Sequence, residues 1–201
     1  MFTSLAWNLL AISFSLNGLI VLFVHYQYVQ SIHPSILRLA IVLFEIAAPT
    51  SMLVSAVVTY VLWPQALLGK GSQGLKSWDT LVQHNANIIL SLVEIGLLGG
   101  LPIRLEDWIA APLFGICYIL FSWFMIHRLV PSGEPQVLYF FLDPTLGWIS
   151  TFALICLLVV LLLFYILFSF IDDFMIHLGG GIIIHSLVIL GVSSIVCRFK
   201  D

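Results

Sequence analysis

The chain has 201 residues, of which 61% are hydrophobic and only 8% are charged, and its mean hydropathy is +1.14. Soluble domains carry about 25% charged residues, so this composition excludes a water-soluble globular fold. The net charge of −3 argues against nucleic acid as a partner. The cysteines, Cys117, Cys156 and Cys197, lie in apolar stretches without a paired spacing, which argues against a disulfide framework or a cysteine zinc site.

Six apolar segments predict six transmembrane helices with no soluble domain. A bilayer crossing takes about 20 residues, and in hydrocarbon the backbone must pair within its own segment, which favours helices. The continuous Leu-rich runs lack the alternation that a barrel needs. In chain order the segments cover residues 5–28, 37–63, 80–101, 108–129, 148–170 and 174–197. The sequence therefore predicts an all-α, polytopic membrane bundle that forms a single domain over residues 1–201.

Basic residues in the predicted loops indicate the orientation of the chain. Basic side chains are more frequent in the loops on the inner side of a membrane. Lys70, Lys76, Arg128, Arg198 and Lys200 share one side, and Arg38 and Arg104 share the other. We therefore expect both termini on the cytoplasmic side, or on the matrix side of an organelle. The endomembrane system, the plasma membrane and an inner organellar membrane all remain open.

The last two predicted helices are the most apolar part of the chain. Asp172 and Asp173 predict a tight loop between them, and Gly179, Gly180 and Gly181 then fall inside the final helix. We interpret these glycines as a site of close backbone packing. The segment 148–170 has almost no polar residues and is therefore expected to be the span most exposed to lipid.

The third predicted helix carries a polar stripe. At 100° per residue its polar residues fall within an arc of about 80°, which must face other helices. Glu45 in the second helix and His127 in the fourth are expected to face the same interior. The predicted polar pocket lies between these three helices, opens toward the inner face, and is lined by Glu45, His84, Asn87, Ser91, Glu94 and His127. Such residues hold a bundle together or form a ligand or reaction site, and both interpretations stay open.

Several motifs, in their order and spacing, resemble a known family. They are Glu45-Ile46-Ala47-Ala48-Pro49, His84-x-x-Asn87 followed by Glu94, Pro102-Ile103-Arg104-Leu105, and Tyr139-Phe140-x-x-Asp143. Between about Trp7 and Trp148 the chain resembles Rolling stone-like multipass membrane proteins, which are related to the androgen-induced (FAR-17a) family.

The resemblance also bears on catalysis. Some androgen-induced family members hydrolyse fatty acid esters of hydroxy fatty acids with a Thr nucleophile and a His. The matching positions here are Ala11 and Asn87, which supply neither a nucleophile nor a base. The resemblance therefore implies that this chain lacks the family mechanism. His84 with a displaced hydroxyl, from Thr3, Ser4, Ser13 or Ser15, leaves a lipid-ester hydrolase as an alternative.

The leading functional hypothesis is a non-enzymatic integral membrane protein. It would bind membrane lipid or serve as an accessory or structural subunit beside other membrane-protein subunits, without a metal or cofactor other than bound lipid. Two lesser alternatives remain. A b-type haem protein would use the pairs His84–His127 and His25–His177, and a transporter would use Glu45 and Glu94.

Overall fold

The computed structural model describes residues 2–26, 32–68, 77–99, 101–129, 142–178 and 181–198. The side chains of Phe2, Gln65, Ala66, Leu68, Ile126, His127 and Leu129 are not among the described groups. The helices are α1 (Phe2–His25), α2 (Pro34–Val57), α3 (Trp63–Leu68), α4 (Trp78–Val93), α5 (Ala110–Leu129), α6 (Trp148–Leu178) and α7 (Gly181–Val196). These ranges contain no strand, so the predicted all-α class is confirmed.

Two π-helical stretches lengthen the spans. Val58–Leu62 joins α2 to α3 without a break, and Glu94–Leu98 extends α4. Gly99, at a φ of 65°, ends this extension, and its N–H donates to the carbonyl of Glu94 over 2.6 Å. A left-handed residue after a helix is most often glycine, because a side chain there is strained.

Side chains mark where two helices begin. Ser77 precedes α4, and its hydroxyl accepts a hydrogen bond from the N–H of Thr80 over 3.3 Å. His33 precedes α2, where its Nδ1 accepts from the N–H of Ser35, and Pro34 occupies the first helical position. Both arrangements satisfy N–H groups that the first turn of a helix leaves without partners.

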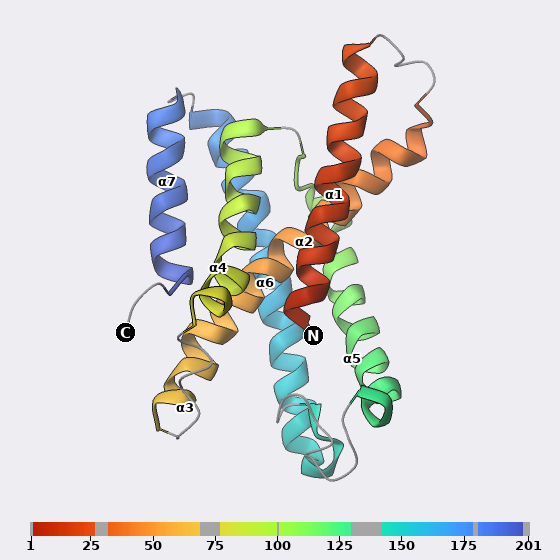
Figure 1. Ribbon diagram of the computed structural model, residues 1–201, viewed down its shortest axis with the longest axis vertical. Coiled ribbons are helices and arrows are strands. Elements are labelled where there is room, and N and C mark those ends of the chain that lie inside the picture. The colour runs from red at the N-terminus through yellow and green to blue at the C-terminus, as the bar shows by residue number, and fades with distance from the viewer. Residues whose placement is uncertain are drawn as a thin grey trace.

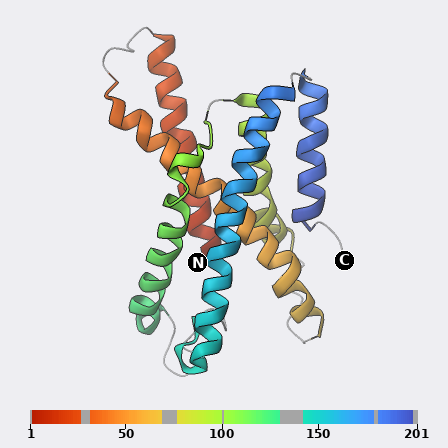
Figure 2. The same cartoon turned by 180° about the vertical axis from the view of Figure 1, so that it is seen from behind.

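α2 is the central helix of the bundle. It packs against α1, α4, α5 and α6, and more lightly against α7. In Figure 1, α1 crosses in front of α2, and α4 lies beside α7. Seen from behind in Figure 2, α6 rises from the lower end of the bundle to the level of the top of α7, and it lies between α5 and α7.

The C-terminal end of α7 is attached to the bundle through its carbonyl groups. The hydroxyl of Thr59 donates to the carbonyl of Val196 over 2.9 Å, and the side-chain amide of Asn85 donates to the carbonyl of Arg198 over 2.7 Å. The hydroxyl of Tyr60 donates to the carbonyl of Ile195. These bonds satisfy acceptors that the end of a helix leaves open.

Within the part of the chain that the structure describes, five helices are long and apolar enough to cross a membrane, and α7 is a shorter apolar helix of 16 residues. Trp78, Trp108 and Trp148 are exposed near helix ends. Tryptophan favours the membrane–water interface, so these residues suit the boundaries of the spans.

The predicted boundary between the last two helices is wrong. Asp172 and Asp173 lie inside α6, which continues to Leu178, and α7 begins at Gly181. The predicted segments 148–170 and 174–197 are therefore corrected to 148–178 and 181–196. Asp172 tolerates this position because it is buried against a backbone N–H. Of the three glycines predicted to pack closely, Gly179 and Gly180 lie outside the described residues. Gly181 has a φ of 66°, and a Cβ there would meet no atom within 4 Å, so it serves a turn rather than close packing.

The predicted exposure of the segment 148–170 is also corrected. α6 buries Leu161, Tyr165 and Phe168 almost completely against its neighbours, whereas α1 buries a much smaller share of its length. Lipid tails and apolar side chains are equally good surroundings for a Leu-rich face. An apolar composition therefore does not distinguish a helix that faces lipid on all sides from one that packs one face against the bundle.

Candidate functional site

Residues 101–107, which connect α4 to α5, turn back into the bundle. Leu101 and Ile103 are each only 3% exposed, although residues 101–104 are not helical. Irregular backbone at membrane depth is tolerated only where protein or water satisfies its polar groups. The 101–107 segment therefore depends on partners from the surrounding helices.

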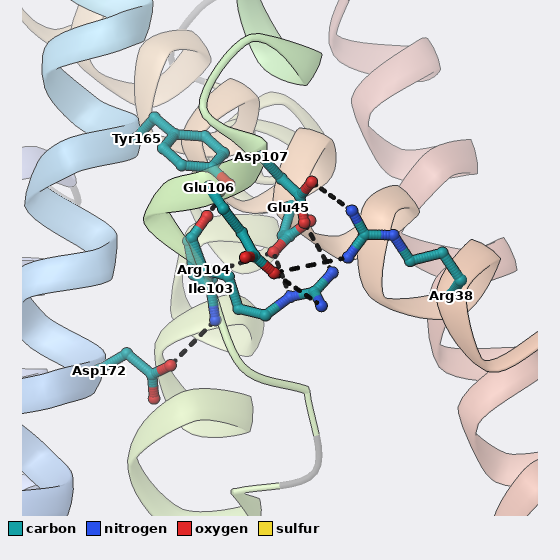
Figure 3. A network of polar contacts seen from close by, with 8 residues as sticks. All are labelled: Arg38, Glu45, Ile103, Arg104, Glu106, Asp107, Tyr165 and Asp172. Atoms are coloured by element: carbon teal, nitrogen blue, oxygen red, sulfur yellow. Dashed lines mark hydrogen bonds and ion pairs between the residues drawn. The ribbon is translucent and has the colours of Figure 1, made fainter.

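Three side chains bond the backbone of this segment (Figure 3). The N–H of Ile103 donates to Oδ2 of Asp172 on α6 over 2.9 Å, and the N–H of Arg104 donates to Oε1 of Glu45 on α2 over 2.9 Å. The hydroxyl of Tyr165 on α6 donates to the carbonyl oxygen of Arg104 over 2.6 Å. α2 and α6 thus satisfy three backbone groups of two consecutive residues.

Ion pairs surround the same segment. The Arg104 guanidinium lies 3.4 Å from Glu45 Oε1, 3.2 Å from Glu106 Oε1 and 2.6 Å from Asp107 Oδ2. Arg38 of α2 also pairs with Asp107 and lies 4.0 Å from Glu106. Both guanidinium groups are engaged by carboxylates, so this network is built to hold the segment in place. No group of three or more potential metal ligands occurs in the described part of the chain.

A separate apolar cavity lies between α2, α5 and α6. It is lined mainly by aliphatic side chains, among them Leu53 and Val57 of α2 and Leu157 and Leu161 of α6. The cavity volume is about 80 Å³. Pockets that hold a drug-sized ligand are larger, roughly 300–1,000 Å³, so this cavity has room for part of a hydrocarbon chain.

Gly115 allows α5 and α6 to approach closely beside this cavity. A Cβ at Gly115 would lie 2.8 Å from Cδ2 of Leu158, so a larger residue would displace that side chain. Both residues also line the cavity. The shape of the cavity therefore depends on a glycine at this position.

A hydroxyl and an imidazole lie together in the wall of the apolar cavity. Thr3 Oγ1 of α1 is 3.4 Å from His84 Nδ1 of α4, and both side chains are partly buried. Thr3 also borders a shallow polar hollow, which it shares with Ser4, Trp7, Asn8 and Gln83. The Trp7 indole N–H bonds the backbone carbonyl of Gln83 over 2.7 Å and joins α1 to α4 there.

The structure does not bring the predicted site residues together in one polar pocket. Glu45 belongs to the network around Arg104, whereas His84 lies at the apolar cavity. The 101–107 segment with its network follows the end of the α4 extension at Leu98. His84 lies 14 residues before that end, or about 20 Å of helix at 1.5 Å per residue. The cavity is bounded by α6 as well as α2 and α5, and α4 contributes only His84 among its lining residues.

The other predicted residues occupy the interior in different ways. Asn87 is fully buried, and neither atom of its side-chain amide has a hydrogen-bond partner among the described residues. Ser91 is buried and donates to the carbonyl of Asn87 over 2.9 Å. Glu94 is buried and accepts from the Asn17 amide of α1 over 3.4 Å. The side chain of His127 lies outside the described residues.

Sequence reasoning missed several residues at these sites. Arg104 and Asp172 were assigned to loops, and Tyr165 was read as part of an apolar span. A useful signal was available, because an irregular Pro102-containing connection between two spans must find backbone partners if it is buried. Thr3 was predicted only as one of four hydroxyl residues that could replace the nucleophile missing at Ala11.

No family model matches this chain, and no curated protein or solved structure matches it significantly. The resemblance to Rolling stone-like proteins therefore stays a prediction.

Proposed function

We propose that this protein binds a membrane lipid and holds its hydrocarbon chain in the apolar cavity between α2, α5 and α6. The observation that carries the proposal is the lining of that cavity, which is almost entirely aliphatic and half-buried within the bundle. An aliphatic chain that enters such a space exchanges one apolar environment for another and gains packing contacts. In this proposal the protein is not an enzyme.

The test is to fill the cavity and measure the lipid that remains bound. Leu157 of α6 lines the cavity and is half-buried, so Leu157→Trp should occupy the space of a chain. Leu163 lies on the same helix but is 56% exposed, and Leu163→Trp is the matched control. The protein is purified in a mild detergent, and its co-purifying lipid is quantified by mass spectrometry.

We expect Leu157→Trp to lose most of the bound lipid and Leu163→Trp to retain it. Equal lipid content in both variants would refute binding in this cavity. If the native particle is instead a large assembly of fixed stoichiometry that holds no lipid, the accessory-subunit hypothesis replaces this one.

A second candidate, lipid-ester hydrolysis, is supported by one contact. Nδ1 of His84 lies 3.4 Å from the hydroxyl of Thr3, and a hydroxyl nucleophile needs a neighbouring base. Attack by Oγ1 on an ester carbonyl would pass the hydroxyl proton to His84, which would return it to the leaving alcohol; water would then release the acyl group. Covalent labelling by a fluorophosphonate that is lost in both Thr3→Val and His84→Leu would support this candidate. Absence of labelling in the wild-type protein would refute it.

A further inference from the structure

The apolar cavity and the polar hollow meet at Thr3, which borders both. On one side lie the aliphatic side chains of α2, α5 and α6. On the other side the polar residues Ser4, Asn8 and Gln83 border the hollow. A molecule that occupied both spaces would be an amphiphile, with its chain in the cavity and its polar head at Thr3.

His84 places a second polar group at this junction. Its Nδ1 lies 3.4 Å from Thr3 Oγ1, and the ring lines the cavity. A hydroxyl both donates and accepts hydrogen bonds, and a neutral imidazole does so through its two nitrogens. Together they can bond a head group that offers both donors and acceptors, such as an alcohol.

The residues around both spaces indicate the charge of that head. Neither the apolar cavity nor the hollow includes Asp, Glu, Lys or Arg among its described lining residues. A charged head that leaves water without an opposite charge pays a large desolvation penalty. The described side chains around both spaces therefore offer a charged head no ion pair.

The depth of the junction fits the same chemistry. His84 is six residues from the exposed Trp78, or about 9 Å along α4 at 1.5 Å per residue. Each polar zone of a bilayer is about 5–8 Å thick, and tryptophan marks it. The junction thus lies near the boundary of the hydrocarbon region, where hydroxyl and ester groups of lipids reside and charged head groups do not.

From these observations we propose that Thr3 and His84 bind the head of the lipid, and that the ligand is a single-chain lipid with an uncharged, hydroxyl-bearing head, as in a monoacylglycerol. This inference rests on the proposed function, because the same cavity holds the chain. It adds the class of lipid and the two residues that select it.

The experiment is photo-crosslinking of the full chain in lipid nanodiscs. Three probes carry the same diazirine-bearing C16 tail on different heads, namely a monoacylglycerol, a fatty acid and a lysophosphatidylcholine. Labelling is measured at pH 9, so that the fatty acid is ionised, and crosslinked peptides are identified by mass spectrometry. We expect the monoacylglycerol to label the cavity residues of α6 at least 10-fold more than either charged probe.

Variants then assign the selectivity to its residues. Thr3→Val and His84→Leu should each reduce the preference for the monoacylglycerol to less than 3-fold, with tail labelling in the cavity retained. Thr151→Val and His177→Leu are the matched controls, because both residues are exposed on α6 and neither lines the cavity. The controls should keep the full preference.

The outcomes separate this inference from the proposed function. Equal labelling by all three probes, or a preference for a charged head, would overturn the inference and leave chain binding in place. Cavity residues that no probe labels would overturn the proposed function itself. The wild-type comparison decides the head preference even if a variant fails to fold.

Discussion

Replacing Glu45 tests whether the 101–107 segment is held by hydrogen bonds to a buried acceptor. Glu45 is fully buried, and its Oε1 accepts both from the N–H of Arg104 over 2.9 Å and from its Nε–H over 3.4 Å. Glu45→Ala removes both bonds and leaves a backbone N–H without that acceptor. Hydrogen bonds to charged groups contribute about 1.5–3 kcal/mol each. Because the second bond is long, we expect Glu45→Ala to lower the free energy of unfolding by about 2–4 kcal/mol.

Glu45→Gln separates the hydrogen bonds from the charge. The amide oxygen can take the position of Oε1 and keep both bonds to Arg104. The amide nitrogen would replace Oε2, which has no donor among the described residues, and would lie near the negative charge of Asp107. We therefore expect Glu45→Gln to cost less than about 1 kcal/mol.

Glu106→Gln is the control for a general loss of negative charge. Its carboxylate lies 3.2 Å and 4.0 Å from the two guanidinium groups, but the side chain is 68% exposed. Exposed ion pairs contribute only about 0.2–1 kcal/mol. The measurement is reversible unfolding by SDS in mixed micelles, followed by tryptophan fluorescence. If Glu45→Ala matches Glu106→Gln, or if Glu45→Gln costs as much as Glu45→Ala, the reasoning fails.

Three further predictions concern other contacts. Tyr165→Phe removes the buried hydroxyl that donates to Arg104 and should cost about 1–2 kcal/mol, measured by the same unfolding assay; no change would mean that the carbonyl finds another donor. Asn85→Ala releases the carbonyl of Arg198 and should speed amide hydrogen exchange in the last turn of α7, whereas an unchanged rate would contradict the role of that bond. Asp143 lies outside the spans, and hydrogen bonds from Thr145 hold its pKa below the ordinary value of 3.8. Because its pKa in the folded state is lowered, ionised Asp143 stabilises the turn at a pH above 3.8, and this contribution is lost as the pH falls through the folded-state pKa. The amide shift of Thr145 should therefore titrate below pH 3.8. Thr145→Ala should raise the pKa of Asp143 toward that value, measured on the Asp143 carboxyl resonance; an unchanged pKa would contradict the assigned cause.

The polar stripe of α4 illustrates what periodicity predicts well. Asn87, Ser91 and Glu94 were expected to face other helices, and all three are buried. The reason is general, since a polar group in hydrocarbon is stable only where protein or water satisfies it. Periodicity gives the face of a helix, but it does not identify the neighbour, and the stripe therefore reaches different partners along its length.

The ionic network shows where sequence patterns were insufficient. Arg38 and Arg104 were counted as loop charges, and Asp172 was placed in a loop between two helices. In the structure Asp172 and Glu45 come from α6 and α2 and bond adjacent residues of the 101–107 segment. The two carboxylates are more than a hundred residues apart in the chain, so no local pattern indicates the pairing.

By itself the sequence determined that this protein is an all-α membrane bundle, because hydrophobic length and the absence of charge leave the backbone no alternative to helices. It also determined which face of α4 avoids lipid. Only the tertiary structure decided that α6 buries one face against α2 and α5, that Leu101 and Ile103 return into the bundle, and that Thr3 and His84 meet beside an apolar cavity. Apolar side chains accept lipid and protein neighbours equally well, so the contacts between helices, rather than their composition, define the candidate site.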